Sequence, residues 1–179
     1  MKPRPGQSEL LQTTLDHALQ YLDSLPDAPV APTATLSQLR SRLHKPPPPG
    51  PADPTEVIDQ LVANVAGGLT GSAGGRFFSW VIGGTVPAAL AADWLTSTWD
   101  QNSGMFAVAP AAAVVEEVCG KWLLDILQLP ASASFALVTG CQMAHVTCLA
   151  AARNAVLKRA GWDVEDRGLI GAPAIRVLT

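Results

Sequence analysis

The sequence has 179 residues, of which 48% are hydrophobic and only 15% are Asp, Glu, Lys or Arg, against about 25% in an average soluble domain. The length allows one ordinary domain, but so few charges leave little polar surface to coat a compact monomer. The net charge of −3, without any block of like charges, argues against a partner such as nucleic acid. We therefore expect apolar surface that another polypeptide covers.

The three cysteines, Cys119, Cys141 and Cys148, are too few for a disulfide framework and show no metal-ligand spacing. Free thiols predict a reducing, cytoplasmic location. No membrane helix is expected, because Pro130 and several polar residues interrupt the uncharged stretch 126–152. The first residues are polar and do not resemble a secretion signal.

The N-terminal quarter predicts a helix within 1–25, capped by Ser8 and stopped by Pro26. The following segment, 26–52, is a proline-rich linker. It favours extended polyproline structure and contains one short helix at Thr35–Leu43, opened by a capping box of Thr35 with Gln38.

Residues 53–75 predict a further helix and a loop. Asp53 is the expected N-cap, Pro54 takes the first helical position and Glu56 lies three residues after the cap. Gly67 and Gly68 are expected to end this helix. Residues 76–84 then form a bulky, extended segment that ends in two glycines.

Two apolar helices follow, each opened by a proline: Pro87 through Trp99, and Pro110 through about Leu127. Both are apolar on most of their faces, which predicts burial on two sides.

The last third predicts the fold class. Residues 134–139 resemble a short buried strand, Gly140 a tight turn, 142–160 a long helix closed by Gly161, and 174–179 a second strand. Strand, helix and strand make a right-handed βαβ unit. Since two strands cannot cover this much helix, we expect an incomplete α/β sheet, as in the front part of a larger protein or a chain completed by another.

The turn from Thr139 to Ala144 is the best candidate for chemistry, because a helix N-terminus at the end of a strand offers free N–H groups to an anion. The turn lacks the glycine patterns of dinucleotide and P-loop sites. Cys141 has two readings, a nucleophile activated at the helix start or a small packing residue. His145 lies one turn further on, without a carboxylate to orient it.

Four blocks of sequence resemble the group II amino acid decarboxylases that depend on pyridoxal phosphate, the aromatic amino acid and glutamate decarboxylase family. In chain order these blocks are 76–95 (Arg-Phe-Phe-Ser-Trp-Val-Ile-Gly-Gly and the residues after it), 99–102, 109–118, and 138–145 together with 149–153. The similarity is nearly continuous over 76–178 and looser over 8–66.

The resemblance implies a fold-type-I enzyme of the aspartate aminotransferase-like class, with pyridoxal 5′-phosphate as cofactor, an amino acid as substrate and an active site at a homodimer interface. Residues 53–75 then belong to the helical arm, and 76–179 begin the large cofactor-binding domain, truncated. Gly140, Cys141 and Gln142 would hold the cofactor's phosphate through backbone N–H groups. Trp80, Ile82 and Gly83 would belong to the substrate-side loop.

The resemblance also implies that no catalytic residue lies in this chain. The family's ring-stacking histidine, its aspartate and its Schiff-base lysine follow the last strand, and none of the four lysines matches their motifs: Lys2, Lys45, Lys121 and Lys158. Relatives often carry a hydroxyl residue at Gln142, Asn at His145 and Ser at Ala109, so only backbone contacts to phosphate carry over. The chain alone is expected to be inactive.

Three alternatives stay open. One is another fold-type-I enzyme, such as an aminotransferase. The second is a non-catalytic interaction protein that forms oligomers through its apolar helices. The third is a thiol enzyme that uses Cys141.

Overall fold

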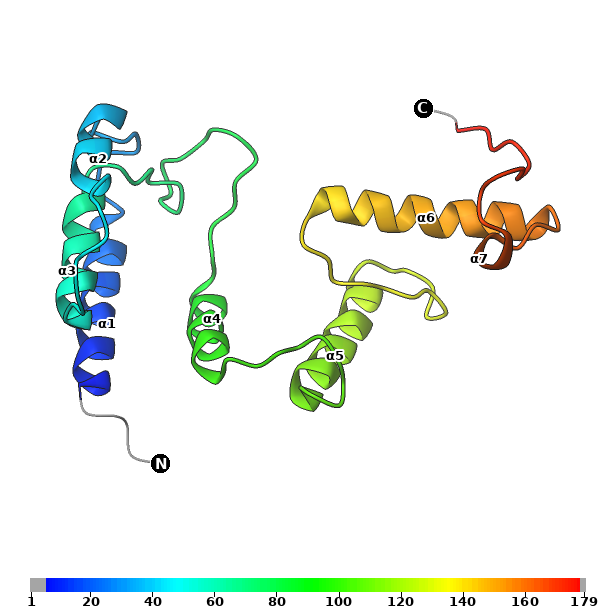
Figure 1. Cartoon of the computed structure of the whole chain (residues 1–179), viewed down its shortest axis with the longest axis horizontal. Helices are drawn as coiled ribbons and strands as arrows, with labels where there is room; N and C mark the ends of the chain where they lie inside the picture. The colour runs from blue at the N-terminus through cyan, green and yellow to red at the C-terminus, as the bar shows by residue number, and fades with distance from the viewer. Residues whose placement is uncertain (1–5, 178–179) are drawn as a thin grey trace. The chain divides into compact units, whose positions relative to one another are not determined.

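The computed structural model describes residues 6–177 and forms seven helices and no strand in that range (Figure 1). The helices are α1 (Gln7–Ser24), α2 (Leu36–Leu43), α3 (Pro54–Val65), α4 (Pro87–Trp99), α5 (Pro110–Ile126), α6 (Cys141–Arg159) and α7 (Val164–Arg167). Two compact units divide the chain between Trp99 and Asp100. The boundary between these units is not the start of a cofactor-binding domain that the sequence predicts at residue 76. That domain start stays a prediction.

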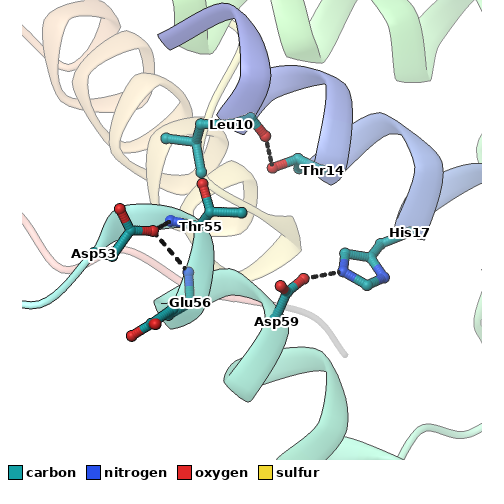
Figure 2. A network of polar contacts seen from close by, with 7 residues as sticks. All are labelled: Leu10, Thr14, His17, Asp53, Thr55, Glu56 and Asp59. Atoms are coloured by element: carbon teal, nitrogen blue, oxygen red, sulfur yellow. Dashed lines mark hydrogen bonds and ion pairs between the residues drawn. The ribbon is translucent and has the colours of Figure 1, made fainter. Parts of the chain in front are cut away.

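In the first unit, α3 packs against both α1 and α2. His17 Nε2 lies 2.6 Å from Asp59 Oδ1 and links α1 to α3 (Figure 2). Arg42 Nη1 donates to the carbonyl oxygen of Ala66 at 2.9 Å, which ties the end of α2 to the end of α3. These side-chain bonds link α1, α2 and α3, none of which contains a fully buried residue.

The loops on either side of α2 and α3 also meet. The N–H groups of Thr33 and Ala34 both donate to the carbonyl oxygen of Gly67, at 2.8 and 2.9 Å. The N–H of Gly71 donates to the carbonyl oxygen of Val30 at 2.9 Å. Backbone pairing therefore holds the proline-rich segment before α2 against the loop after α3.

Two of the three predicted helix caps in this unit are confirmed. The capping box of Thr35 and Gln38 is complete, and the Asp53 carboxylate accepts from the N–H groups of Thr55 and Glu56 at 2.9 and 3.1 Å (Figure 2). The predicted cap Ser8 is wrong, because α1 begins earlier, with Gly6 as its N-cap. Gly6 has a left-handed backbone, which a glycine adopts without steric cost.

In the second unit, the ring of Phe135 lies against Gly120, which is buried in α5. An added Cβ on Gly120 would overlap the ring, so the loop before α6 approaches α5 this closely only because residue 120 has no side chain. This contact joins α5 to the segment that leads into α6.

A second corner joins α6 to α7. Trp162 Nε1 donates to the carbonyl oxygen of Gly168 at 2.9 Å, and the Arg167 guanidinium lies 3.7 Å from the centre of the Trp162 ring. Asn154 Nδ2 donates to Glu165 Oε1 at 2.6 Å, while the Asp163 carboxylate accepts from the N–H of Glu165 and caps α7. Glu165 and Asp163 therefore have structural roles at this corner.

The two predicted strands do not form in the described residues. Residues 133–138 and 172–177 are irregular, and residues 178 and 179 of the second segment lie outside the described range. A strand satisfies its N–H and C=O groups only by pairing with a neighbour. Residues 6–177 supply no sheet for either segment, so this structure shows only the helical part of the predicted α/β fold.

Apolar burial within the described residues is limited to Ala109 and Leu157, which are 2% and 1% exposed. Helix α4 has no buried residue, and α5 buries only Gly120. The burial on two sides expected for these helices is therefore not provided by the described chain. Within the same range, no helix has the length and hydropathy that a bilayer span requires.

Candidate cofactor-binding site

The N-terminus of α6 is open. Gly140, its N-cap, has φ 132° and ψ 172°, and no side chain caps the helix. The first backbone bond of the turn runs from the N–H of Ala144 to the carbonyl oxygen of Gly140 at 3.1 Å, which leaves the N–H groups of Cys141, Gln142 and Met143 without an intrahelical acceptor. An added Cβ on Gly140 would meet nothing within 4 Å, so no neighbouring group crowds the N-cap residue.

Electrostatics at this end also favour an anion. No acidic residue lies in the first turn of α6, so no carboxylate there repels an anion, and the positive end of the helix dipole lies at this turn. The helices α2, α3 and α7, in contrast, use Thr35, Asp53 and Asp163 to cap their own N–H groups. The residues present at the start of α6 therefore fit a phosphate group held by backbone donors.

Cys141 and His145 contact each other across the first turn of α6. Cys141 Sγ lies 3.6 Å from His145 Nε2, and Cys141 is exposed. Their helical spacing of four residues brings them together. In the described part of the chain no carboxylate orients His145, so this pair lacks the third group of a nucleophilic triad.

The predicted substrate-side residues lie in a loop of the first unit, between residue 77 and α4. Trp80 is 87% exposed and has φ 62°, and Ile82 is 54% exposed. Gly83 has open space around it. This loop and the turn at the start of α6 belong to different units of the chain.

Other candidate groups form no further centre. Among residues 6–177, no cluster of three His, Cys, Asp or Glu side chains is arranged to hold a metal ion. An open, mostly apolar groove of about 740 Å³ lies in the first unit, lined by residues of α1 and α3 and the loops beside them. His17 is one of the polar residues that line it. The sequence did not predict the pairing of His17 with Asp59, because residues 42 positions apart leave no local signal of their contact.

Comparison with known proteins places these features in a family. The pyridoxal-dependent decarboxylase conserved domain matches residues 38–169, which include α3 to α7 and all of α2 except its first two residues. The chain is 28% identical over 152 residues to an aromatic-L-amino-acid decarboxylase of Bacillus atrophaeus, covering 85% of this chain and 31% of the relative. It is 28% identical over 166 residues to tryptophan decarboxylase 1 of Oryza sativa subsp. japonica, covering 86% and 32%.

A third relative is tyrosine decarboxylase 2 of Arabidopsis thaliana, with 26% identity over 176 residues that cover 90% of this chain and 32% of the relative. The chain thus spans about a third of the length of the curated relatives that it matches. The family match extends over well over half of the chain and includes the open turn at the start of α6. The chain belongs to the pyridoxal-dependent decarboxylase family.

Proposed function

We propose that this chain is the N-terminal part of a pyridoxal 5′-phosphate-dependent decarboxylase that acts on an aromatic amino acid. The family match over residues 38–169 carries the proposal. The names of the three relatives, which specify aromatic amino acids, tryptophan and tyrosine, support the substrate class. The complete protein is a cytoplasmic homodimer in this proposal, and the chain by itself is inactive because it contributes no cofactor-binding lysine.

The contribution of this chain to the site is the anchoring of the cofactor's phosphate. The free N–H groups of Cys141 and Gln142 donate to phosphate oxygens, and the dipole of the 19-residue helix α6 adds favourable potential. Gly140 lets the backbone turn toward the phosphate without a side chain in the way. The cofactor, when bound, supplies an electron sink for the loss of the substrate's carboxylate.

The loop with Trp80, Ile82 and Gly83 is proposed to face the substrate. Its aromatic and aliphatic side chains are exposed in the described chain, and they offer the kind of contact that an aromatic substrate buries. The irregular segments 133–138 and 172–177 become strands once neighbouring strands of the complete fold-type-I domain pair with them. Further polypeptide and a second subunit cover the apolar faces of α4 and α5.

The decisive experiment uses the complete protein that contains this chain. Purified protein reconstituted with pyridoxal 5′-phosphate is assayed for release of carbon dioxide and amine from phenylalanine, tyrosine, tryptophan and glutamate. Amine from an aromatic amino acid supports the proposal. Cofactor binding with transamination alone would favour the aminotransferase-like alternative, and a protein that binds no cofactor would contradict both.

The phosphate anchor is tested separately with two variants at one position. Cys141→Pro removes one N–H donor while keeping a residue that the first helical position accepts, whereas Cys141→Ala keeps the N–H and removes only the thiol. We expect Cys141→Pro to weaken cofactor binding about tenfold or more, since a hydrogen bond to a charged group contributes about 1.5 kcal/mol or more. Equal affinities for the two variants would contradict the anchor while leaving the decarboxylase assignment intact.

A thiol enzyme is the second candidate, favoured by the 3.6 Å contact of Cys141 Sγ with His145 Nε2. In that case Cys141→Ala abolishes activity. In the decarboxylase proposal Cys141→Ala stays active, so the same variant separates the two functions.

A further inference from the structure

We propose that residues 45–51 form a docking motif for a protein module that binds polyproline helices through an aromatic groove with an acidic pocket. The motif is Lys-Pro-Pro-Pro-Pro-Gly-Pro. It lies in the connection between α2 and α3, and neither the family match nor the proposed decarboxylase function assigns it a role. The inference is independent of the proposed function.

The motif is exposed throughout in the described chain. All residues from 43 to 54 are exposed, and residues 44–53 form no helix or strand. Within the described chain no hydrogen bond involves residues 46–52. Five of these seven residues are prolines, which have no N–H to donate and whose fixed φ favours the polyproline helix. A partner therefore meets a segment whose four consecutive prolines, residues 46–49, are stiff and cost little conformational entropy to order.

The connection is longer than its path requires. It leads from the end of α2, which is bonded to the C-terminal end of α3 through Arg42, back to Asp53 at the start of α3. The 12 residues of α3 span about 18 Å, and ten residues of polyproline helix reach about 31 Å. Because the segment is longer than this distance, it does not have to run straight along α3. It bends at Pro49 and Gly50.

The spacing of the motif gives it one distinctive edge. A polyproline helix has three residues per turn, so Lys45, Pro48 and Pro51 share one edge when the segment is extended. Pro46 and Pro49 lie on a second edge, without a charge. Gly50, which extends without steric cost, is the residue that straightens the bend. A cation followed by two prolines at this spacing fits a groove with two aromatic-lined pockets and an acidic pocket beyond them.

The positive charge of the motif, on Lys45, is not engaged by another described side chain. The structure records no ion pair or hydrogen bond for the side chain of Lys45 in the described residues, whereas Arg42 is engaged with the carbonyl oxygen of Ala66. After Pro51 the next charged residue is Asp53, whose carboxylate caps α3. Within the motif the one cation, Lys45, precedes the prolines, which fixes the direction in which the motif enters a groove.

The test is a titration of the full chain into a ¹⁵N-labelled Src-homology 3 domain that has an acidic pocket beside its aromatic groove. We expect shifts of the groove resonances. The Pro48→Ala/Pro51→Ala double variant loses affinity by at least about tenfold, because two anchors leave their pockets. Lys45→Ala loses about threefold, the size expected of an exposed ion pair. The matched control Pro46→Ala, on another edge, retains the wild-type affinity.

Two results would overturn the inference. One is the absence of groove shifts at about 1 mM chain, which would mean that the dissociation constant lies well above about 1 mM. The other is an equal loss in Pro46→Ala and in the double variant, which would mean contact without recognition of the edge. Circular dichroism of each variant checks that the helices are retained, and a domain with a neutralised acidic pocket should no longer distinguish Lys45→Ala from wild type.

Discussion

His17 and Asp59 join α1 to α3 through one short contact, 2.6 Å between Nε2 and Oδ1, in a helix pair that buries no residue completely. Their side chains are 27% and 53% exposed. Solvent therefore screens the pair, and its contribution to the free energy of unfolding is small even though the atoms are close.

We predict that His17→Ala and Asp59→Ala each lower the free energy of unfolding by less than about 1 kcal/mol, and that the double variant loses no more than the larger single change. Urea titrations of all four proteins give this cycle. The coupling should shrink in high salt, since exposed charges are screened. Additive losses would show that the two side chains act independently.

The Asp53 cap is predicted to matter more than its exposure suggests. Its carboxylate satisfies the N–H groups of Thr55 and Glu56, and loss of such a cap costs about 1 kcal/mol. Asp53→Ala should therefore lower the urea midpoint and speed hydrogen exchange in the first turn of α3. Asp53→Asn retains an acceptor and is the matched control. Identical exchange in the two variants would mean that water replaces the cap.

These caps also show which parts of the fold sequence alone can predict. The starts of α3, α4 and α5 follow from Pro54, Pro87 and Pro110 because a helix start depends on neighbouring residues only. The strand expected at 134–139 does not form in this structure, for the opposite reason. Strand formation depends on partners distant in sequence, and the described residues supply none.

The candidate site divides in the same way. Gly140 marks a turn into a long helix, so the open N-terminus of α6 was predictable from local sequence. The contact of Phe135 with Gly120 was not, because a phenylalanine in an apolar stretch and a glycine inside a helix give no signal of their meeting. Family resemblance, not spacing, linked the turn to a phosphorylated cofactor.

Gly120 is predicted to tolerate no side chain while Phe135 is present. Gly120→Ala places a methyl group where the ring lies, and such overpacking costs about 1–3 kcal/mol. Phe135→Ala alone should cost stability through lost burial. The double variant should recover part of the Gly120→Ala loss, since the methyl group then has room. Thermal unfolding of the complete protein measures the stability of all three variants. If the double variant loses as much stability as the two single variants together, or more, the contact between Gly120 and the Phe135 ring is contradicted.

Gly140 is predicted to depend on its missing side chain for a different reason. Nothing lies within 4 Å of an added Cβ, so a substitution meets no clash, but φ 132° lies outside the conformations that other residues adopt. Gly140→Asn should therefore cost about 1–3 kcal/mol in backbone strain, or shift the start of α6 and weaken cofactor binding in the complete protein.

Gly161, after the end of α6, is the matched control, because it also has open space and its φ of 78° is closer to the left-handed region that asparagine tolerates. Gly161→Asn should leave cofactor affinity unchanged and cost less stability than Gly140→Asn. Cofactor titration and urea unfolding of both variants separate the two effects. Equal losses at the two positions would show that the requirement at Gly140 is general to helix ends and owes nothing to the phosphate-binding turn.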